Sequence, residues 1–362
     1  MKRFLIPFLA ALTLPTFVNA NVDPKIAEIC MKATDFQGCV KSMSGQKENN
    51  LNTNSEYQKA ITFFREGDSL KANKLIKTFL KKNPTSKEGW ILKAFINNYE
   101  FDKSEDAIEE IDKALDIDDG YAFAHALKAE IFYFDLGGSF SKTLKYLKKG
   151  IDISPEDPHV NFIAGDIQFD NGFVVLGGDT FDLSKKSKDK KALSLKSFEE
   201  AKKSFEKTLA NINLDTYKNP LAESSYILDV KYTTTALLGD TKFELYFLYK
   251  DIKERSKAKQ YLKEALDHYS KAISMAPPQE EVENLELDEG LDLISPADLY
   301  LVRGDVYSFM NNKWKSACND WKVSKKLGNE IDDKQQHAYS FSLENSAISA
   351  HKLLLLIVPR FF

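Results

Sequence analysis

Apolar residues recur along the chain at steps of three and four, which is the period of an amphipathic helix. The clearest stretch is KEALDHYSKAISMAP, residues 263 to 277, in which Ala265, Tyr269 and Ala272 fall on one helical face and Pro277 follows. Small alanines allow a second helix to approach closely, the aromatic ring fills the space between the two helices, and proline stops the helix. The pattern predicts helices that pack in pairs.

The helical pattern is interrupted at a nearly constant period. Asn83-Pro84, Asp118-Asp119 and Ser154-Pro155 break it at spacings of 35 and 36 residues. Three glycines, each followed by an aspartate, occupy a matching small-residue position in other copies: Gly165, Gly239 and Gly304. A fixed period of this length indicates stacked repeats of one helix pair each.

The spacing of Ala265, Tyr269, Ala272 and Pro277 resembles the second helix of a tetratricopeptide repeat (TPR), whose pattern is A-x3-F/Y-x2-A-x4-P. The resemblance covers roughly three quarters of the chain, and six repeats are assigned, at about residues 53 to 86, 87 to 121, 122 to 157, 158 to 217, 221 to 279 and 295 to 330. It implies an all-α fold, a right-handed superhelical solenoid of antiparallel helix pairs whose first helices line a concave groove.

Several segments depart from the repeat pattern. An insertion in the fourth repeat, at about 171 to 196, carries a Gly177-Gly178 turn and a lysine run, and we expect a solvated loop. The extra length of the fifth repeat predicts helices longer than their neighbours. An acidic linker covers about 277 to 296 and is expected to be mobile. Residues 331 to 362 form a C-terminal tail or a capping helix over the last repeat.

The first 20 residues have the order of a secretory signal peptide. Lys2 and Arg3 precede an almost wholly apolar stretch from Phe4 to Pro15, and Ala20 ends the segment at the predicted cleavage site. The alternative is an uncleaved membrane anchor, but the apolar stretch is shorter than the ~20 residues that a membrane-spanning helix needs. We therefore expect an exported protein.

The three cysteines fit an exported protein unequally. Residues 21 to 52 are expected to form a small helical element that contains Cys30 and Cys39, and oxidising conditions favour a disulfide between them. The alternative is two half-buried thiols. Cys318 has no partner in this element and is expected to be a small buried side chain.

Composition and motifs argue against several functional classes. The formal net charge is −4, and of the 50 basic residues only five are Arg, so the bidentate fork preferred for phosphate and guanine is scarce and nucleic acid is not an expected partner. The five histidines are scattered, and neither Gly137-Gly138 nor Gly177-Gly178 belongs to a phosphate-binding motif. We expect no metal, no cofactor and no catalytic activity.

Counting from the small-residue position of each repeat predicts which side chains face the groove. Aromatic residues alternate with polar or acidic ones in this row: Tyr57, Phe64, Phe95, Asn98, Glu130, Tyr133, Phe162, Asp166, Phe169, Asp240, Phe243 and Asp305. The hypothesis is a groove that grips an apolar segment bearing Lys or Arg, with aromatic anchors and acidic selection. The alternative is that several aromatics pack between neighbouring helices and that Gly-Asp is a feature of helix geometry.

These inferences predict a protein-interaction scaffold or assembly factor in an exported compartment. The Lys-, Asn- and Ile-rich composition and the CMKATDFQGC element resemble TPR proteins of cyanobacteria, which implies a periplasm or a thylakoid lumen. Other proteins are the expected partners. The alternative is a structural protein that contacts a membrane surface without spanning it, docked by the lysine-rich insertion or by the apolar tail LLLLIVPRFF.

Overall fold

The computed structural model describes residues 51–65, 67–178, 180, 183–212, 224–279 and 294–329. The predicted signal peptide, the element with Cys30 and Cys39, most of the acidic linker and the C-terminal tail lie outside these residues. The described part contains twelve α-helices, one π-helical turn and no strand.

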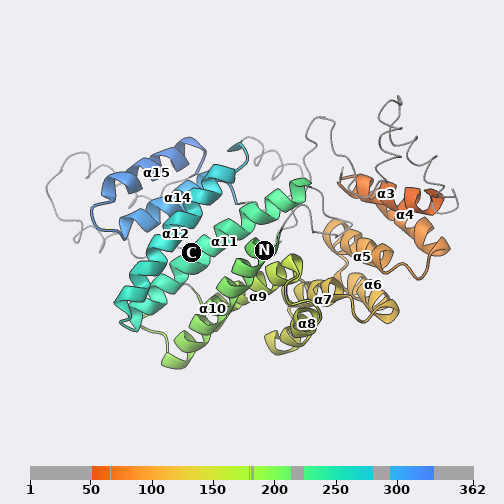
Figure 1. Cartoon of the computed structure of the whole chain (residues 1–362), viewed down its shortest axis with the longest axis horizontal. Helices are drawn as coiled ribbons and strands as arrows, with labels where there is room; N and C mark the ends of the chain where they lie inside the picture. Colours follow the sequence, from red (N-terminus) through yellow and green to blue (C-terminus); the bar gives the residue numbers. More distant parts are fainter. Residues whose placement is uncertain are drawn as a thin grey trace, which may run out of the picture.

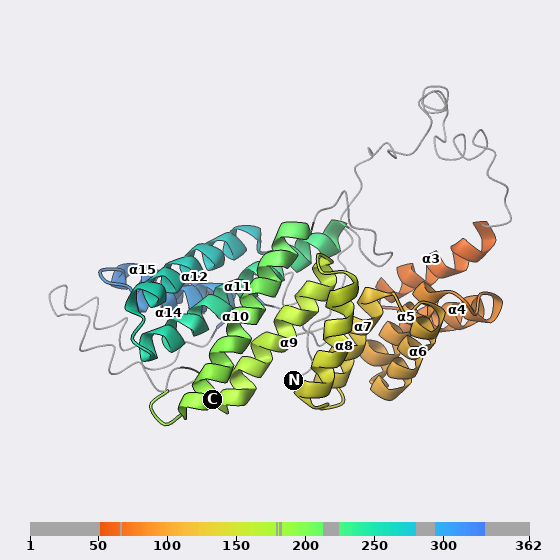
Figure 2. The same cartoon turned by 60° about the horizontal axis from the view of Figure 1, so that its bottom comes forward.

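The helices form six successive pairs. They are α3 (Leu51–Arg65) with α4 (Ser69–Lys82), α5 (Lys87–Phe95) and its π-helical extension η2 (Ile96–Glu100) with α6 (Ser104–Ile117), α7 (Ala122–Phe134) with α8 (Phe140–Ile153), α9 (Pro158–Leu176) with α10 (Lys188–Asn211), α11 (Ser224–Asp251) with α12 (Arg255–Met275), and α14 (Pro296–Ser308) with α15 (Trp314–Lys326). Figure 1 shows the pairs following one another from α3 and α4 to α14 and α15, and Figure 2 shows the same order from another side. The predicted all-α stack of helix pairs is confirmed.

Local sequence signals account for the helix ends. Helix α9 begins with Pro158 in its first turn, and the Asp157 carboxylate accepts hydrogen bonds from the backbone N–H groups of His159 and Val160. Helix α14 begins with a capping box between Ser295 and Asp298. Because these caps satisfy backbone donors that a helix leaves unpaired, the repeat boundaries follow from residues close in sequence.

Three of the helix pairs share one packing contact between a glycine and an aromatic ring. A Cβ atom placed on Gly165 would lie 2.5 Å from the ring of Phe205, one on Gly239 would lie 3.0 Å from Tyr269, and one on Gly304 would lie 2.5 Å from Trp321. Each ring belongs to the second helix of the pair. The small-residue position predicted from the sequence is therefore the point where the second helix presses an aromatic ring onto the first.

The helices of the fourth and fifth pairs are the longest described. Helix α10 has 24 residues and α11 has 28, whereas α3 to α8 have 15 or fewer. Nearly all of α11 from Val230 to Tyr249 is buried, because α10 and α12 flank it and other segments cover it. The longer helices predicted for the fifth repeat are thus present, and α11 contributes many residues to one large apolar cluster.

The insertion in the fourth repeat differs from the expected solvated loop. Most of residues 171 to 196 is helical, since α9 continues to Leu176 and α10 begins at Lys188. The connection also packs on the fifth pair: Leu183 is buried in the apolar cluster around α11, and the buried Thr180 hydroxyl donates a hydrogen bond to Glu244. Apolar contacts to a helix some 60 residues away, which the local pattern does not reveal, explain the difference.

Candidate protein-interaction surface

The twelve residues predicted to face the groove all lie on the first helices of the pairs or on η2. Three of the aromatics are core residues, with Tyr57 and Phe95 each 6% exposed and Phe243 4% exposed. Tyr57 packs on Phe79 of its own pair, with ring centroids 5.3 Å apart, and Phe95 stacks on Phe123 of the next pair at 5.9 Å. For these three positions the structure matches the alternative that the aromatics pack between helices.

Two of the predicted acids bind the second helix of their own pair. Tyr269 donates a 2.5 Å hydrogen bond to Asp240 Oδ1, and Trp321 Nε1 donates one of 2.9 Å to Asp305 Oδ1. Burial raises the pKa of Asp240 to about 6, against the opposing effect of the hydrogen bond from Tyr269. In both pairs the donor is the aromatic residue that packs on the glycine directly before the aspartate. The Gly-Asp sequence therefore stabilises the pairing of the two helices.

Side chains of the row also connect successive first helices. Asn98 Nδ2 donates to Asp135 Oδ2 at 2.9 Å, from η2 to the end of α7, and the Tyr133 hydroxyl donates to Asp170 Oδ2 at 2.9 Å, from α7 to α9. Donor and acceptor are 37 residues apart in each case, about one repeat period. These two hydrogen bonds, which we call the inter-repeat rungs, fix polar groups of three first helices relative to one another.

The π-helical turn η2 supplies the first rung. It extends α5 by one wide turn, in which Asn97 Nδ2 donates to the buried Glu110 of α6 at 2.8 Å and Asn98 reaches Asp135. A π-helical turn inserts a residue into the helical period, and such turns are frequent at functional positions. The adjacent residues Asn97 and Asn98 therefore donate hydrogen bonds to two different neighbours, α6 and the end of α7.

The middle of the row keeps part of its surface accessible. Glu130, Tyr133, Asp166 and Asp170 are partly exposed, and Asp135 is exposed. All five lie on α7 and α9 or at the end of α7, and these two first helices pack against each other. We call this set, which carries four carboxylates and one phenol, the acidic face.

Three further predicted aromatics are half-buried: Phe162 and Phe169 lie on α9, which carries part of the acidic face, and Phe64 lies on α3. Phe64 packs against the apolar clusters of the first and second pairs, Phe162 lies 6.3 Å from the ring of Phe205, and Phe169 packs edge-on to Phe198 at 5.7 Å. Each ring is thus held by neighbouring helices while part of it remains accessible. Aromatic surface of this kind, next to fixed acids, suits an apolar segment that bears basic residues.

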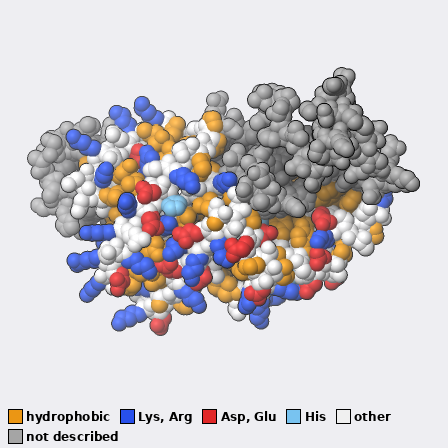
Figure 3. All heavy atoms as spheres, in the orientation of Figure 1, with side chains coloured by type: hydrophobic (Ala, Val, Ile, Leu, Met, Phe, Trp, Pro, Cys, Tyr) orange, Lys and Arg blue, Asp and Glu red, His pale blue; other side chains and the backbone are white. Residues whose placement is uncertain are grey.

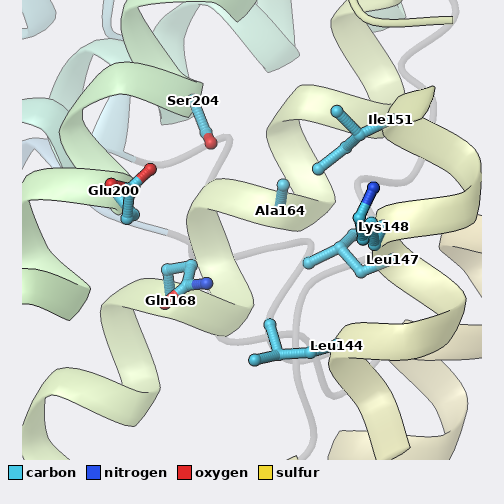
Figure 4. A pocket seen from close by; sticks show the side chains of 8 residues that line it. All are labelled: Leu144, Leu147, Lys148, Ile151, Ala164, Gln168, Glu200 and Ser204. Atoms are coloured by element: carbon cyan, nitrogen blue, oxygen red, sulfur yellow. The ribbon is translucent and has the colours of Figure 1, made fainter. Parts of the chain in front are cut away.

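A separate small pocket lies between α8, α9 and α10 (Figure 4). Helix α8 contributes three apolar residues and a lysine, α9 contributes an alanine and a glutamine, and α10 contributes two polar residues: Leu144, Leu147, Lys148, Ile151, Ala164, Gln168, Glu200 and Ser204. Ala164 and Gln168 are four residues apart on one side of α9, whereas Asp166 lies between them in sequence and so points to the opposite side. The pocket and the acidic face therefore occupy different sides of α9.

Sequence reasoning missed the two acids that accept the rungs. Asp135 and Asp170 were not among the projected groove positions, although each follows a projected residue with a hydrogen-bond donor, Asn98 or Tyr133, by about one repeat. Searching for an acid one period after each polar row residue would have found both. It also missed the hydrogen-bonding roles of Tyr269 and Trp321.

Within the described ranges, no group of three or more His, Cys, Asp or Glu side chains is placed to hold a metal ion. None of the described helices has both the length and the apolar character needed to cross a membrane. Cys318 is buried in the last helix pair, whereas Cys30 and Cys39 lie outside the described residues.

Comparisons with known proteins find similarity only at the level of structure. No protein-family model matches the chain, and no curated protein matches it. Among solved structures, it is similar to the MamA protein, with 15% identity, a TM-score of 0.37, and coverage of 67% of this chain and 97% of that one. It is also similar to PilW, a widely conserved type IV pilus biogenesis factor, with 16% identity, a TM-score of 0.34 and coverage of 61% and 95%.

A third similar structure is a tetratricopeptide repeat protein from Parabacteroides merdae, with 16% identity, a TM-score of 0.32, and coverage of 81% of this chain and all of that one. Because these identities and TM-scores are low, the fold is described from the helices of this chain alone. There, six antiparallel helix pairs, three of which close on a glycine, form a TPR-like stack.

Proposed function

We propose that the chain is a protein-interaction scaffold that binds a partner segment bearing basic and apolar residues on the acidic face. The observation that supports this is the pair of inter-repeat rungs, which hold the carboxylates of Asp135 and Asp170 in fixed positions on the first-helix side of the stack. Because these carboxylates are already held in place, less conformational freedom is lost when a ligand binds them. The half-buried side chains of Phe162 and Phe169 add apolar contact area. The proposal assigns the chain no catalytic reaction.

The test is a binding titration with two fluorescent peptides that differ only in charge. One alternates Leu or Phe with Lys, and the other has Glu in place of each Lys. The acidic-face variant carries Glu130→Gln and Asp166→Asn, which remove two negative charges without touching either rung. A matched control carries Glu105→Gln and Glu109→Gln, both exposed acids of α6.

The proposal expects the basic peptide to bind the native chain more tightly than the acidic one. It also expects the acidic-face variant to bind the basic peptide about tenfold more weakly, as the loss of one or two favourable charge contacts would produce. The control variant should bind as the native chain does. Equal weakening in both double variants would mean that net charge, and not this surface, drives binding.

We further propose that the chain acts in an exported compartment, a periplasm or a thylakoid lumen. The support is the order of charged, apolar and small residues in positions 1 to 20. Cell fractionation of a tagged chain tests this, with a variant that lacks residues 2 to 20 as the control. Recovery of both forms in the cytoplasmic fraction would contradict it.

A further inference from the structure

Two lysine-rich segments that are far apart in sequence meet at one end of the stack. Residues 185–196 comprise the three residues before α10 and the first turns of that helix. Residues 250–259 comprise the end of α11, the turn after it and the start of α12. Lys191 Nζ pairs with Asp251 Oδ2 at 2.9 Å, and Lys257 Nζ lies 3.5 Å from Glu199 Oε1 of α10. We call these two segments together the basic end.

The basic end has a charge opposite to that of the whole protein. It contains ten lysines, one arginine and three acids, a net charge of +8, within a chain whose formal charge is −4. Nine of its eleven cationic side chains are exposed, and among the described residues only Lys191 and Lys257 of this set pair with a carboxylate. Figure 3 shows Lys and Arg side chains projecting around the ends of α10, α11 and α12, at the lower left of the view.

Exposed apolar side chains lie within the same two segments. Leu193 is 55% exposed and Ile252 is 47% exposed, among the largest exposures of any described apolar residue. A partner that offers only diffuse negative charge has no apolar region in which these side chains could be buried. A membrane interface offers both, because its anionic headgroups attract lysines and its acyl boundary accepts apolar side chains.

We propose that the basic end docks the protein on an anionic lipid surface. The composition favours lipid over nucleic acid, since ten of the eleven cations are lysines and the arginine fork that pairs with phosphate and guanine occurs once. The two surfaces use different residues, because the acidic face belongs to α7 and α9, whereas the basic end belongs to the start of α10 and to the turn from α11 to α12.

Vesicle flotation of the full chain tests the proposal. Vesicles of phosphatidylcholine alone are compared with vesicles that contain phosphatidylglycerol, at low and at physiological salt. The basic-end variant carries Lys188→Gln, Lys190→Gln, Lys253→Gln and Lys259→Gln, all exposed and without ion-pair partners among the described residues. A matched control carries Lys74→Gln, Lys77→Gln, Lys81→Gln and Lys145→Gln, exposed lysines of α4 and α8.

We expect binding to the anionic vesicles only, at least tenfold weaker for the basic-end variant and unchanged for the control, with native helicity in both. Equal loss in the two variants, no flotation of the native chain, or tighter binding to duplex DNA than to vesicles would overturn the proposal. Flotation that persists in the basic-end variant but disappears when residues 352 to 362 are deleted would assign docking to the tail instead. Peptide binding to the acidic face, measured on the same variants, reports on the scaffold proposal separately.

Discussion

Trp321 Nε1 donates a 2.9 Å hydrogen bond to Asp305 Oδ1 while the indole ring covers the preceding Gly304. One side chain of α15 thus both packs closely on the glycine of α14 and makes a buried polar contact with the same helix. The same combination joins Tyr269 to Gly239 and Asp240 one pair earlier. The adjacency of glycine and aspartate therefore has a structural use, because the aromatic residue needs space over one and an acceptor on the other.

The Gly304→Ala substitution tests this contact. Its Cβ atom would lie 2.5 Å from Trp321, so the ring must shift, and overpacking of this kind costs about 1–3 kcal/mol of the free energy of unfolding. Urea denaturation followed by circular dichroism measures the loss. Lys322→Ala, at an exposed position of α15, serves as the control, and equal stabilities for the two variants would contradict the packing account.

Asp240 should make the stability of the fold depend on pH. Burial raises its pKa from the ordinary value of 3.8 to about 6, so between these values the folded state holds a proton that the unfolded state has lost. Raising the pH through this window therefore favours unfolding, by about 1–3 kcal/mol for a shift of this size in a half-buried group. Unfolding curves at several pH values should show this decline in the native chain and a smaller one in Asp240→Asn. Parallel pH profiles would refute the assignment.

Glu199 should have the opposite pH dependence. Its carboxylate accepts hydrogen bonds from Tyr249 and Tyr261, both at 2.8 Å, and pairs with Lys202 at 2.7 Å. Burial alone raises the pKa of Glu199, but the hydrogen bonds from these three residues together outweigh it and lower the pKa to about 2. The stabilisation is thus complete above the ordinary glutamate pKa of 4.5 and is lost as the pH falls toward 2.

Replacing Glu199 with Gln should therefore destabilise the contact between α10, α11 and α12. We expect a loss of about 1–3 kcal/mol at neutral pH, which shrinks in acid, as hydrogen bonds to a charged group imply. Glu200→Gln removes a neighbouring charge whose partner Lys203 is solvent-exposed, and it should change the stability by less than about 1 kcal/mol. Identical effects of the two substitutions would mean that the buried network adds nothing.

The three cysteines should react differently with an alkylating reagent. Cys318 is buried, so in the native protein it should react slowly, and unfolding should expose it. If Cys30 and Cys39 form the predicted disulfide, the exported protein alkylates at one site after unfolding and at three after reduction. Mass spectrometry of the intact chain counts the added groups and also reports whether residues 1 to 20 have been removed. Three additions without reduction would exclude the disulfide.

The sequence predicted the helix pairs and their pairing points well because those signals are local. Ala265, Tyr269 and Ala272 are within eight residues of one another, and their spacing alone places them on one face of α12. The caps of α9 and α14 are equally local. The groove residues were harder to interpret: helical projection identified Tyr57, Phe95 and Phe243 as members of the first-helix row, but it could not distinguish a ring that faces a partner from one buried against the next helix.

By itself, the sequence determined that this protein is a stack of helix pairs with a small residue where each pair closes, because a period of three to four fixes one face of each helix. Only the tertiary structure decided which distant residues meet: Asn98 with Asp135, Trp321 with Asp305, and Lys191 with Asp251. These contacts depend on the lengths of the helices and the angles between them. Those quantities are set by packing summed over many side chains, and no short window of sequence contains them.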